Sequence, residues 1–165
     1  MGELAWLEGY SGETVDGLLA LERTHRIDSL VLAFEQAIRQ KAAQEGDDSL
    51  TSEERVVLAI EALEREVNNG GFDQFFVNAM EFAPVIVEAL YRIGCPKVAG
   101  IAQMAIDALQ MPIVSASEIE KVIYEDNDIR DKALDRCDRL FFEYPEPIER
   151  RLFAFIKANK SRFKL

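Results

Sequence analysis

Apolar residues recur at intervals of three and four along nearly the whole chain, which is the spacing of one face of an α-helix. No stretch alternates apolar and polar residues as a half-buried strand would require. The pattern predicts an all-α protein with helices near residues 14–23, 29–44, 51–68, 72–79, 84–93, 96–110, 118–125, 128–142 and 147–160.

Residues at the predicted helix boundaries support this division. Thr51 and Ser115 each stand three residues before a glutamate, Glu54 and Glu118, which is the spacing of a capping box. No linker or low-complexity run divides the chain. We therefore expect residues 1–165 to form a single domain, a multi-helix bundle.

The charge of the chain is strongly acidic, with 30 acidic and 19 basic residues and a formal net charge of −11. The last 16 residues hold six bases and no acid, so the first 149 hold 13 bases against 30 acids, a net of −17. Such a body repels nucleic acid and anionic lipid and attracts basic partners. We expect no direct binding to nucleic acid or membranes, although solubility alone is the simpler explanation of the composition.

The two cysteines, Cys95 and Cys137, fall at apolar helical positions without metal-ligand or disulfide spacing, which fits a reducing compartment. The N-terminus lacks the features of a signal peptide, and no apolar run approaches the roughly 20 residues of a membrane span. We expect a cytoplasmic protein.

Recognisable catalytic and metal-binding patterns are absent from the sequence. His25 is the sole histidine, and no nucleophile elbow, phosphate loop or dinucleotide motif occurs. The segment from Asp126 suggests a calcium loop but has Arg130, Asp131 and Cys137 where a ligand, a glycine and a glutamate are required. We expect no catalytic site, no metal and no cofactor, and hence not an enzyme.

Residues 67–78, Val-Asn-Asn-Gly-Gly-Phe-Asp-Gln-Phe-Phe-Val-Asn, are the most distinctive stretch of the sequence. Two glycines there are free to take the left-handed backbone that ends a helix. Gln74 and Asn78 are four residues apart and are expected to hydrogen-bond to each other. We expect a structural role for Asn68, Asn69, Gly70, Gly71, Phe72, Asp73, Gln74 and Phe75, with a recessed ligand site in this region as the alternative.

This stretch resembles the hallmark of a bacterial family that was first catalogued as a domain of unknown function and that includes a dimeric DNA-mimic protein. The resemblance spans residues 15–160. It implies an all-helical fold, a homodimer, and an acidic surface that occupies the DNA-binding face of a transcription regulator. Abundant apolar surface supports the dimer, since Phe153 lies off the apolar face predicted for the last helix.

Acidic residues gather in three places where they could stand in for phosphates. The first is a stripe on the helix near 128–142, with acids just upstream of it. Spacings of 3, 4 and 3 put its four aspartates within about 80° and along about 15 Å. These residues are Asp128, Asp131, Asp135 and Asp138, preceded by Glu118, Glu125 and Asp126. The second set is Glu45, Asp47, Asp48, Glu53 and Glu54, and a weaker third is Glu61 and Glu64.

The alternative for each set is an ordinary solvated face. On the helix near 128–142, Asp128–Lys132 and Asp135–Arg139 would then be common i,i+4 pairs. Ile129, Ala133, Cys137 and Leu140 are expected to form the apolar side of this helix. Phe142 continues the acidic arc and would be an exposed anchor if the helix reaches it, but we expect it to pack inward at the helix end.

The leading hypothesis is a homodimeric DNA mimic that blocks operator binding by a DNA-binding protein, a transcription repressor. One rival is an immunity or antitoxin-like protein that blocks a nuclease by the same electrostatics. The other is a small-ligand-binding protein or enzyme that uses the Asn68–Asn78 region. Partner capture separates the first two, and a thermal-shift ligand screen addresses the third.

Overall fold

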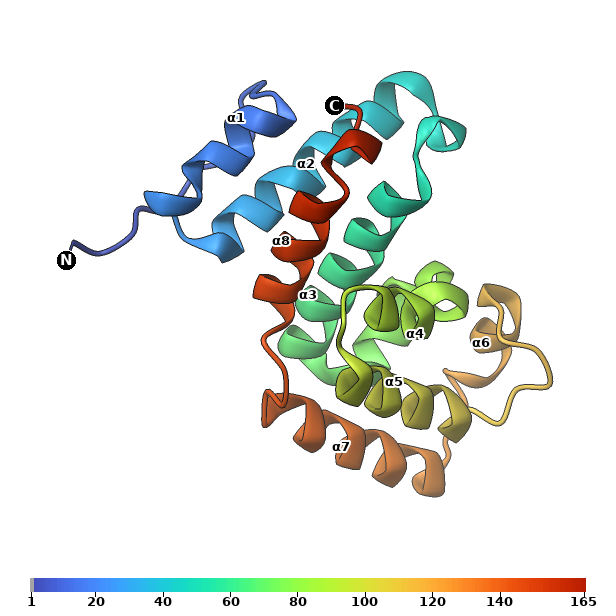
Figure 1. Ribbon diagram of the computed structural model, residues 1–165. Helices are drawn as coiled ribbons and strands as arrows, with labels where there is room; N and C mark the ends of the chain where they lie inside the picture. Colours follow the sequence, from blue (N-terminus) through green and yellow to red (C-terminus); the bar gives the residue numbers. More distant parts are fainter. Residues whose placement is uncertain (1) are drawn as a thin grey trace. The chain divides into compact units, whose positions relative to one another are not determined.

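Residues 2–165 are described by the computed structural model, and they form eight α-helices and four short 3-10 helices (Figure 1). The β-type pairing within these residues is limited to an isolated bridge between Ala5 and His25. The all-α fold predicted from the apolar spacing is therefore confirmed. No helix in this range has both the length and the apolar character needed to cross a membrane.

The helices gather into two compact units. Unit 1 contains the residues up to Glu61 together with Ile148–Leu165, and unit 2 contains Ala62–Pro147. Unit 1 holds α1 (Val15–Ala20), α2 (Ile27–Glu45), the first turns of α3 (Ser52–Asn78) and α8 (Ile148–Ala158). Unit 2 holds the rest of α3 with α4 (Ala83–Arg92), α5 (Pro96–Ala108), α6 (Ala116–Val122) and α7 (Asp128–Phe142). The expectation of one domain over residues 1–165 stays a prediction.

The buried carboxylate of Glu54 joins three segments of unit 1. Its Oε2 accepts the backbone N–H of Thr51 at 3.0 Å while Thr51 Oγ1 accepts the N–H of Glu54 at 3.2 Å, which confirms the predicted capping box. Lys41 of α2 donates to both carboxylate oxygens, and the backbone N–H of Lys164 donates to Oε1 at 2.8 Å. The start of α3, the end of α2 and the C-terminal segment are thus tied to one anion.

The basic residues near the C-terminus pair with acids of the same unit. Lys157 bonds Glu22 at 2.7 Å, and Lys160 bonds Asp16 at 3.0 Å. The uneven charge of the sequence is therefore partly balanced inside unit 1. These pairs hold the C-terminal segment against the N-terminal helices.

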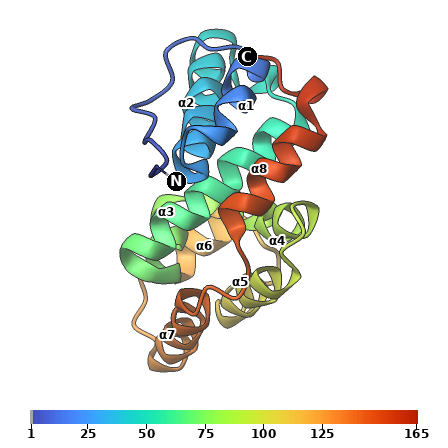
Figure 2. The same cartoon turned by 60° about the vertical axis from the view of Figure 1, so that its left-hand side comes forward.

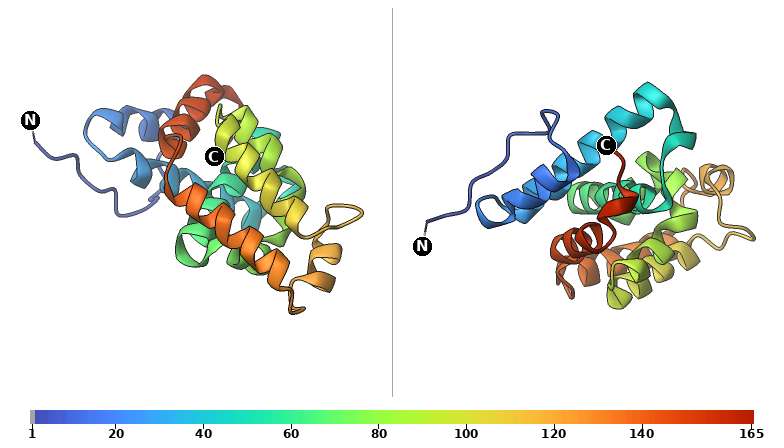
Figure 3. Two further views of the ribbon diagram at one scale, coloured as in Figure 1. Left: turned by 90° about the horizontal axis from the view of Figure 1, so that it is seen from below. Right: turned by 45° about the horizontal axis from the view of Figure 1, so that its top comes forward.

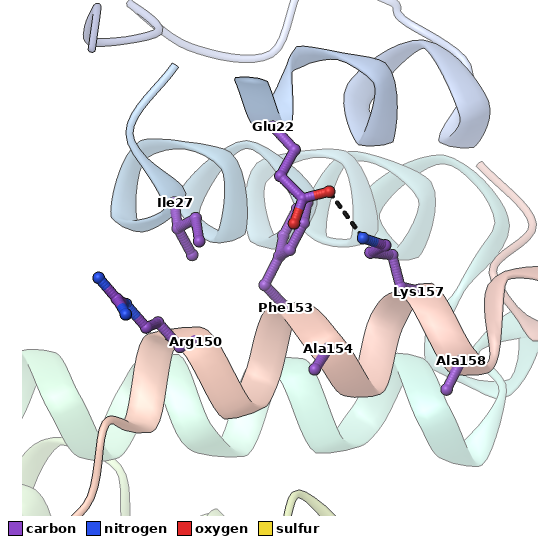
Figure 4. Close-up of a pocket in the computed structure, with 7 residues that line it drawn as sticks. All are labelled: Glu22, Ile27, Arg150, Phe153, Ala154, Lys157 and Ala158. Atoms are coloured by element: carbon purple, nitrogen blue, oxygen red, sulfur yellow. Dashed lines mark hydrogen bonds and ion pairs between the residues drawn. The ribbon is translucent and has the colours of Figure 1, made fainter. Parts of the chain in front are cut away.

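Phe153 of α8 is only 2% exposed, so the expectation that it contributes spare apolar surface is wrong. Its ring points from α8 toward Glu22, in the 3-10 helix Leu21–Arg23, and toward Ile27 at the start of α2 (Figure 4). The helical wheel of α8 alone does not show that the N-terminal helices cover Phe153. The dimer expected from the resemblance loses this supporting observation.

In unit 2, α4 and α5 pack against each other, and α7 lies along α5 (Figures 2 and 3). The turn after α7 is fixed by Glu146, a buried residue whose Oε1 accepts the backbone N–H of Val98 at 2.8 Å in the first turn of α5. Helix α7 begins and ends where the sequence predicted, at Asp128 and Phe142. It is therefore held to α5 along its length and through the turn that follows it.

Candidate functional site

The two glycines of the 67–78 motif break α3 within its length. Gly71 has φ 77° and ψ −178°, a backbone conformation that is essentially restricted to glycine. A Cβ atom at Gly71 would also lie 2.8 Å from Cγ of Asp138. The predicted turn is confirmed, and it divides α3 into a long first part and a short second part that begins at Phe72.

Asp138 of α7 caps the second part of α3. Its Oδ1 accepts the backbone N–H of Phe72 at 2.8 Å, which satisfies one of the amides left without an intrahelical partner at a helix start. The Phe72 ring packs edge-to-face on Phe141 of α7, with ring centroids 5.9 Å apart. Helix α7 is therefore joined to the motif by both a polar and an aromatic contact.

Burial is the main cause that raises the pKa of the Asp138 carboxyl above its ordinary value, and the nearby charges of Asp135 and Asp73 act in the same direction. The hydrogen bond from Phe72 opposes them. Asp138 is half-buried, so it is not a member of the exposed acidic row predicted on α7. That part of the prediction is wrong, because Asp138 turns inward to the glycine turn.

Glu66 bridges the two parts of α3 across the glycine break. Gln74 donates to its carboxylate at 2.8 Å and Asn78 at 3.0 Å, and these bonds lower the pKa of Glu66, with the Asn78 bond as the larger cause. The expected bond between Gln74 and Asn78 is replaced by their shared acceptor. Asn68 donates in the same way to Glu64 at 2.9 Å. The side-chain amides of the motif are thus engaged in hydrogen bonds within α3, around the glycine turn.

The outer face of α7 presents a row of three aspartates, which we call the aspartate row: Asp128, Asp131 and Asp135. At 100° per residue they fall within about 60°, and they extend along about 10 Å of a helix held by its other face. Neither Asp128 nor Asp135 forms an ion pair with any residue in the described part of the chain, so the i,i+4 pairs of the alternative interpretation are not formed. Asp131 contacts Arg130 at 3.2 Å.

The buried face of α7 differs from the predicted one. It consists of Arg130, Leu134, Cys137 and Phe141, whereas Ile129 is 83% exposed. Arg130 turns back to donate to the carbonyl of Val122 at 2.5 Å and to that of Glu125 at 2.6 Å. The guanidinium thereby caps the end of α6, which no local sequence signal indicates.

The remaining predicted acids divide by burial. Glu53, Glu54, Glu61 and Glu64 are buried, so the expectation that they present charge at the surface is wrong. Glu54 has the partners described above, and Glu53 pairs with Arg162 at 3.3 Å. Glu118 is half-buried and bonds Lys121 at 2.7 Å. The exposed members of the predicted sets, besides the aspartate row, are Glu45, Asp47, Asp48, Glu125 and Asp126.

The excess negative charge lies mainly in unit 2, which has 16 acidic and 8 basic residues and a formal net of −8, against −3 for unit 1 with 14 and 11. The face of α7 is not uniformly acidic, because Lys132, Arg136 and Arg139 are also exposed. At 100° per residue these bases lie to one side of the aspartate row. The row is therefore an acidic strip with a basic margin.

Unit 1 contains an open groove of about 550 Å³ between α8 and the N-terminal helices (Figure 4). Phe153 and Ile27 supply apolar lining, and Arg150 and Lys157 lie at its edge. Lys157 is bonded to Glu22 across the groove. The residues that line the groove lie outside the 67–78 motif and outside the aspartate row. Among these lining residues, Arg150 is the only cation that is not bonded to an acid.

Replacing Gly71 by alanine should destabilise the protein, because alanine cannot adopt this backbone without strain of about 1–3 kcal/mol and its Cβ would meet Asp138. The matched control is Gly100→Ala in α5, where a Cβ meets nothing within 4 Å. The control should be neutral or stabilising by up to about 1 kcal/mol. Urea unfolding measures both, and equal stabilities of the two variants would contradict the assigned role of Gly71.

Replacing Asp138 separates its hydrogen bond from its charge. Asp138→Ala removes the cap of Phe72 and should cost about 0.5–2 kcal/mol of unfolding free energy. Asp138→Asn retains an acceptor oxygen and should stay close to the wild type. If both variants lose the same stability, the carboxylate acts by something other than capping.

The same pair of variants gives a prediction for pH. Because the folded-state pKa of Asp138 is raised, the folded protein binds this proton more readily than the unfolded chain does. The wild type should therefore gain stability relative to Asp138→Asn as pH falls through the raised pKa toward the ordinary value near 3.8. Unfolding free energies of both proteins at pH 7 and pH 4 test this, and a gap that moves in the opposite direction would contradict it.

Comparison with known proteins identifies a family for the chain. No curated protein and no solved structure matches the chain. The model of one family, described as DMP19-like protein, matches residues 48–159, a span that includes the glycine turn, the aspartate row and all of unit 2. On that match the chain belongs to the DMP19-like protein family.

Proposed function

We propose that this protein is a DNA mimic that uses the aspartate row of α7 to occupy the DNA-binding face of a transcription repressor and block its operator. The observation that carries the proposal is the row itself, three exposed aspartates on one side of a helix in the unit with the larger negative charge. The resemblance of the 67–78 motif to a family that includes a DNA mimic supports it.

The spacing of the row suits this role. Residues three and four apart on a helix have Cβ atoms about 5–6 Å apart, so the row sets out negative charges at regular intervals. Double-stranded DNA presents one charge per 1.7 Å of axis when both strands are counted. A single row therefore imitates part of one strand, and the exposed Glu125 and Asp126 extend it at the N-terminal end of α7.

The rigidity of the row follows from the contacts beneath it. Asp138, Phe141 and Glu146 fix α7 and the turn after it to the glycine turn and to α5. A charge pattern that is held in place before binding loses little conformational entropy when the partner docks. The row is suited to a cytoplasmic protein partner with a basic cleft.

A nuclease inhibitor would use the same charges against a different basic cleft, and partner identity is what separates the two functions. A ligand site in the Asn68–Asn78 region has less support from the geometry. Asn68, Gln74 and Asn78 all donate to glutamates of α3, so these amides are engaged within the chain.

The homodimer implied by the resemblance remains part of the proposal. Two copies would carry a formal charge of −22, which increases the rate of association with a basic partner and its dependence on salt. Sedimentation equilibrium at micromolar concentration tests the prediction. A dimer mass is expected, and a monomer mass would contradict it.

Replacing Asp128, Asp131 and Asp135 together by asparagine should weaken partner binding by about tenfold at low salt, because each exposed charge contributes up to about 1 kcal/mol. The salt dependence should become shallower as well. The measurement is capture of partners from native cytosol at low salt on wild-type and variant protein, with identification of what elutes as salt rises. A repressor recovered by the wild type should be released by its own operator DNA.

The matched control replaces Glu45 by glutamine and Asp47 and Asp48 by asparagine, which removes the same three charges from exposed positions in unit 1. This variant should bind as the wild type does. Loss of binding only in this control would move the site to residues 45–48. Recovery of a nuclease instead of a repressor would favour the inhibitor function.

A further inference from the structure

The aspartate row continues into an exposed aromatic residue. At 100° per residue, Phe142 lies about 20° from Asp131 and from Asp135 and about 10 Å beyond Asp135 along the helix axis. The structure places Phe142 inside α7 and leaves it 54% exposed, so the expected inward packing is wrong. The residue that packs inward at this end is Phe141, which is 2% exposed.

Tyr144 adds a second aromatic ring at the same end of α7. It is 47% exposed and has φ 52°, a left-handed backbone conformation that is costly for a bulky residue and is usually given to glycine or asparagine after a helix. Its N–H bonds the carbonyl of Phe141 at 3.0 Å, which closes the helix. The chain therefore keeps an exposed tyrosine where a small residue would be less strained.

The end of α7 and the turn after it, which carry these two rings, are fixed in place. Glu146, two residues after Tyr144, is 7% exposed and accepts the N–H of Val98 in α5. The ring of Phe142 packs against that of Phe141, with centroids 6.2 Å apart. Exposed aromatic side chains on a rigid frame are typical of the anchors that contribute most of the free energy of a protein interface.

From these observations we infer that Phe142 and Tyr144 are an apolar anchor at the end of the aspartate row, an inference that rests on the proposed function. The occupant is a cationic protein cleft that has an apolar recess at one end. The aspartates match the cationic part of the cleft, and the Phe142 ring enters the recess. DNA offers no side chain of this kind, so the anchor lets the protein bind the cleft by contacts that the operator lacks.

The chain supplies a matched control for the anchor. Ile129 is 83% exposed, more than Phe142, but at 100° per residue it lies about 140° away around α7, on the side with Lys132 and Arg136. If exposed apolar surface alone caused binding, Ile129 would contribute as much as Phe142. If the aspartate row and the anchor act as one surface, Ile129 would contribute little to binding.

The test uses two synthetic helical peptides of equal length and positive charge as probes. In one, leucines alternate with lysines at helical spacing, and in the other, serines replace the leucines. By fluorescence anisotropy the wild type should bind the leucine peptide about tenfold more tightly than the serine peptide. Phe142→Ala should reduce this preference to about twofold, and Ile129→Ala should retain it.

Two further variants separate the anchor from the charges and from the fold. The triple asparagine variant of the aspartate row should bind both peptides more weakly and keep the preference for leucine. Tyr144→Gly should weaken binding of the leucine peptide without lowering the midpoint of unfolding, because glycine is favoured in this backbone conformation. If Tyr144 had a purely structural role, Tyr144→Gly would lower both the affinity for the leucine peptide and the midpoint of unfolding.

The outcomes distinguish the anchor from the proposed function. Equal binding of the two peptides by the wild type, or a full preference in Phe142→Ala, would overturn the anchor. A failure of the proposed function would give a different result. Phe142→Ala would still reduce the preference for the leucine peptide, but the triple asparagine variant would bind the peptides with the affinity and salt dependence of the wild type. Circular dichroism of each variant confirms that it remains helical.

Discussion

The hydrogen bond from the backbone N–H of Phe72 to the Asp138 carboxylate is the contact that ties α7 to the glycine turn of α3. It forms where Gly71 takes a conformation that only glycine adopts readily, and a Cβ there would displace the carboxylate. Phe72 and Phe141 then pack beside it. One face of α7 is thereby committed to the glycine turn, and Asp128, Asp131 and Asp135 lie on the adjoining arc of the helix, which is exposed to solvent.

Burial decides which acids of this acidic chain are available to a partner. Glu54 is fully buried because Lys41 and two backbone amides compensate its charge, and Asp138 turns inward to a helix start. Compensation of this kind satisfies the rule that a buried charge needs partners. Asp128 and Asp135 have no such partners in the described chain, so their negative charge is directed outward. A high content of acids therefore serves two purposes, helix capping and surface charge.

Much of the fold followed from the sequence, because the signals for helices are local. Apolar spacing predicted the helices, and the capping pair Thr51 and Glu54 and the turn at Gly71 formed as expected. Two of the wrong predictions concern places where distant segments meet. Asp138 caps a residue 66 positions earlier, and Phe153 is covered by the N-terminal helices. Helical periodicity cannot distinguish a solvated face from one that a distant segment covers.

We propose that the α7 face from Asp128 to Tyr144 is the surface that docks into a DNA-binding protein. Amide hydrogen exchange of the complex with the captured repressor tests this most directly. We expect slower exchange in residues 128–144 of this protein and in the DNA-contacting segment of the repressor, with residues 45–50 unchanged. Protection of residues 45–50, with α7 exchanging as it does in the free protein, would contradict it.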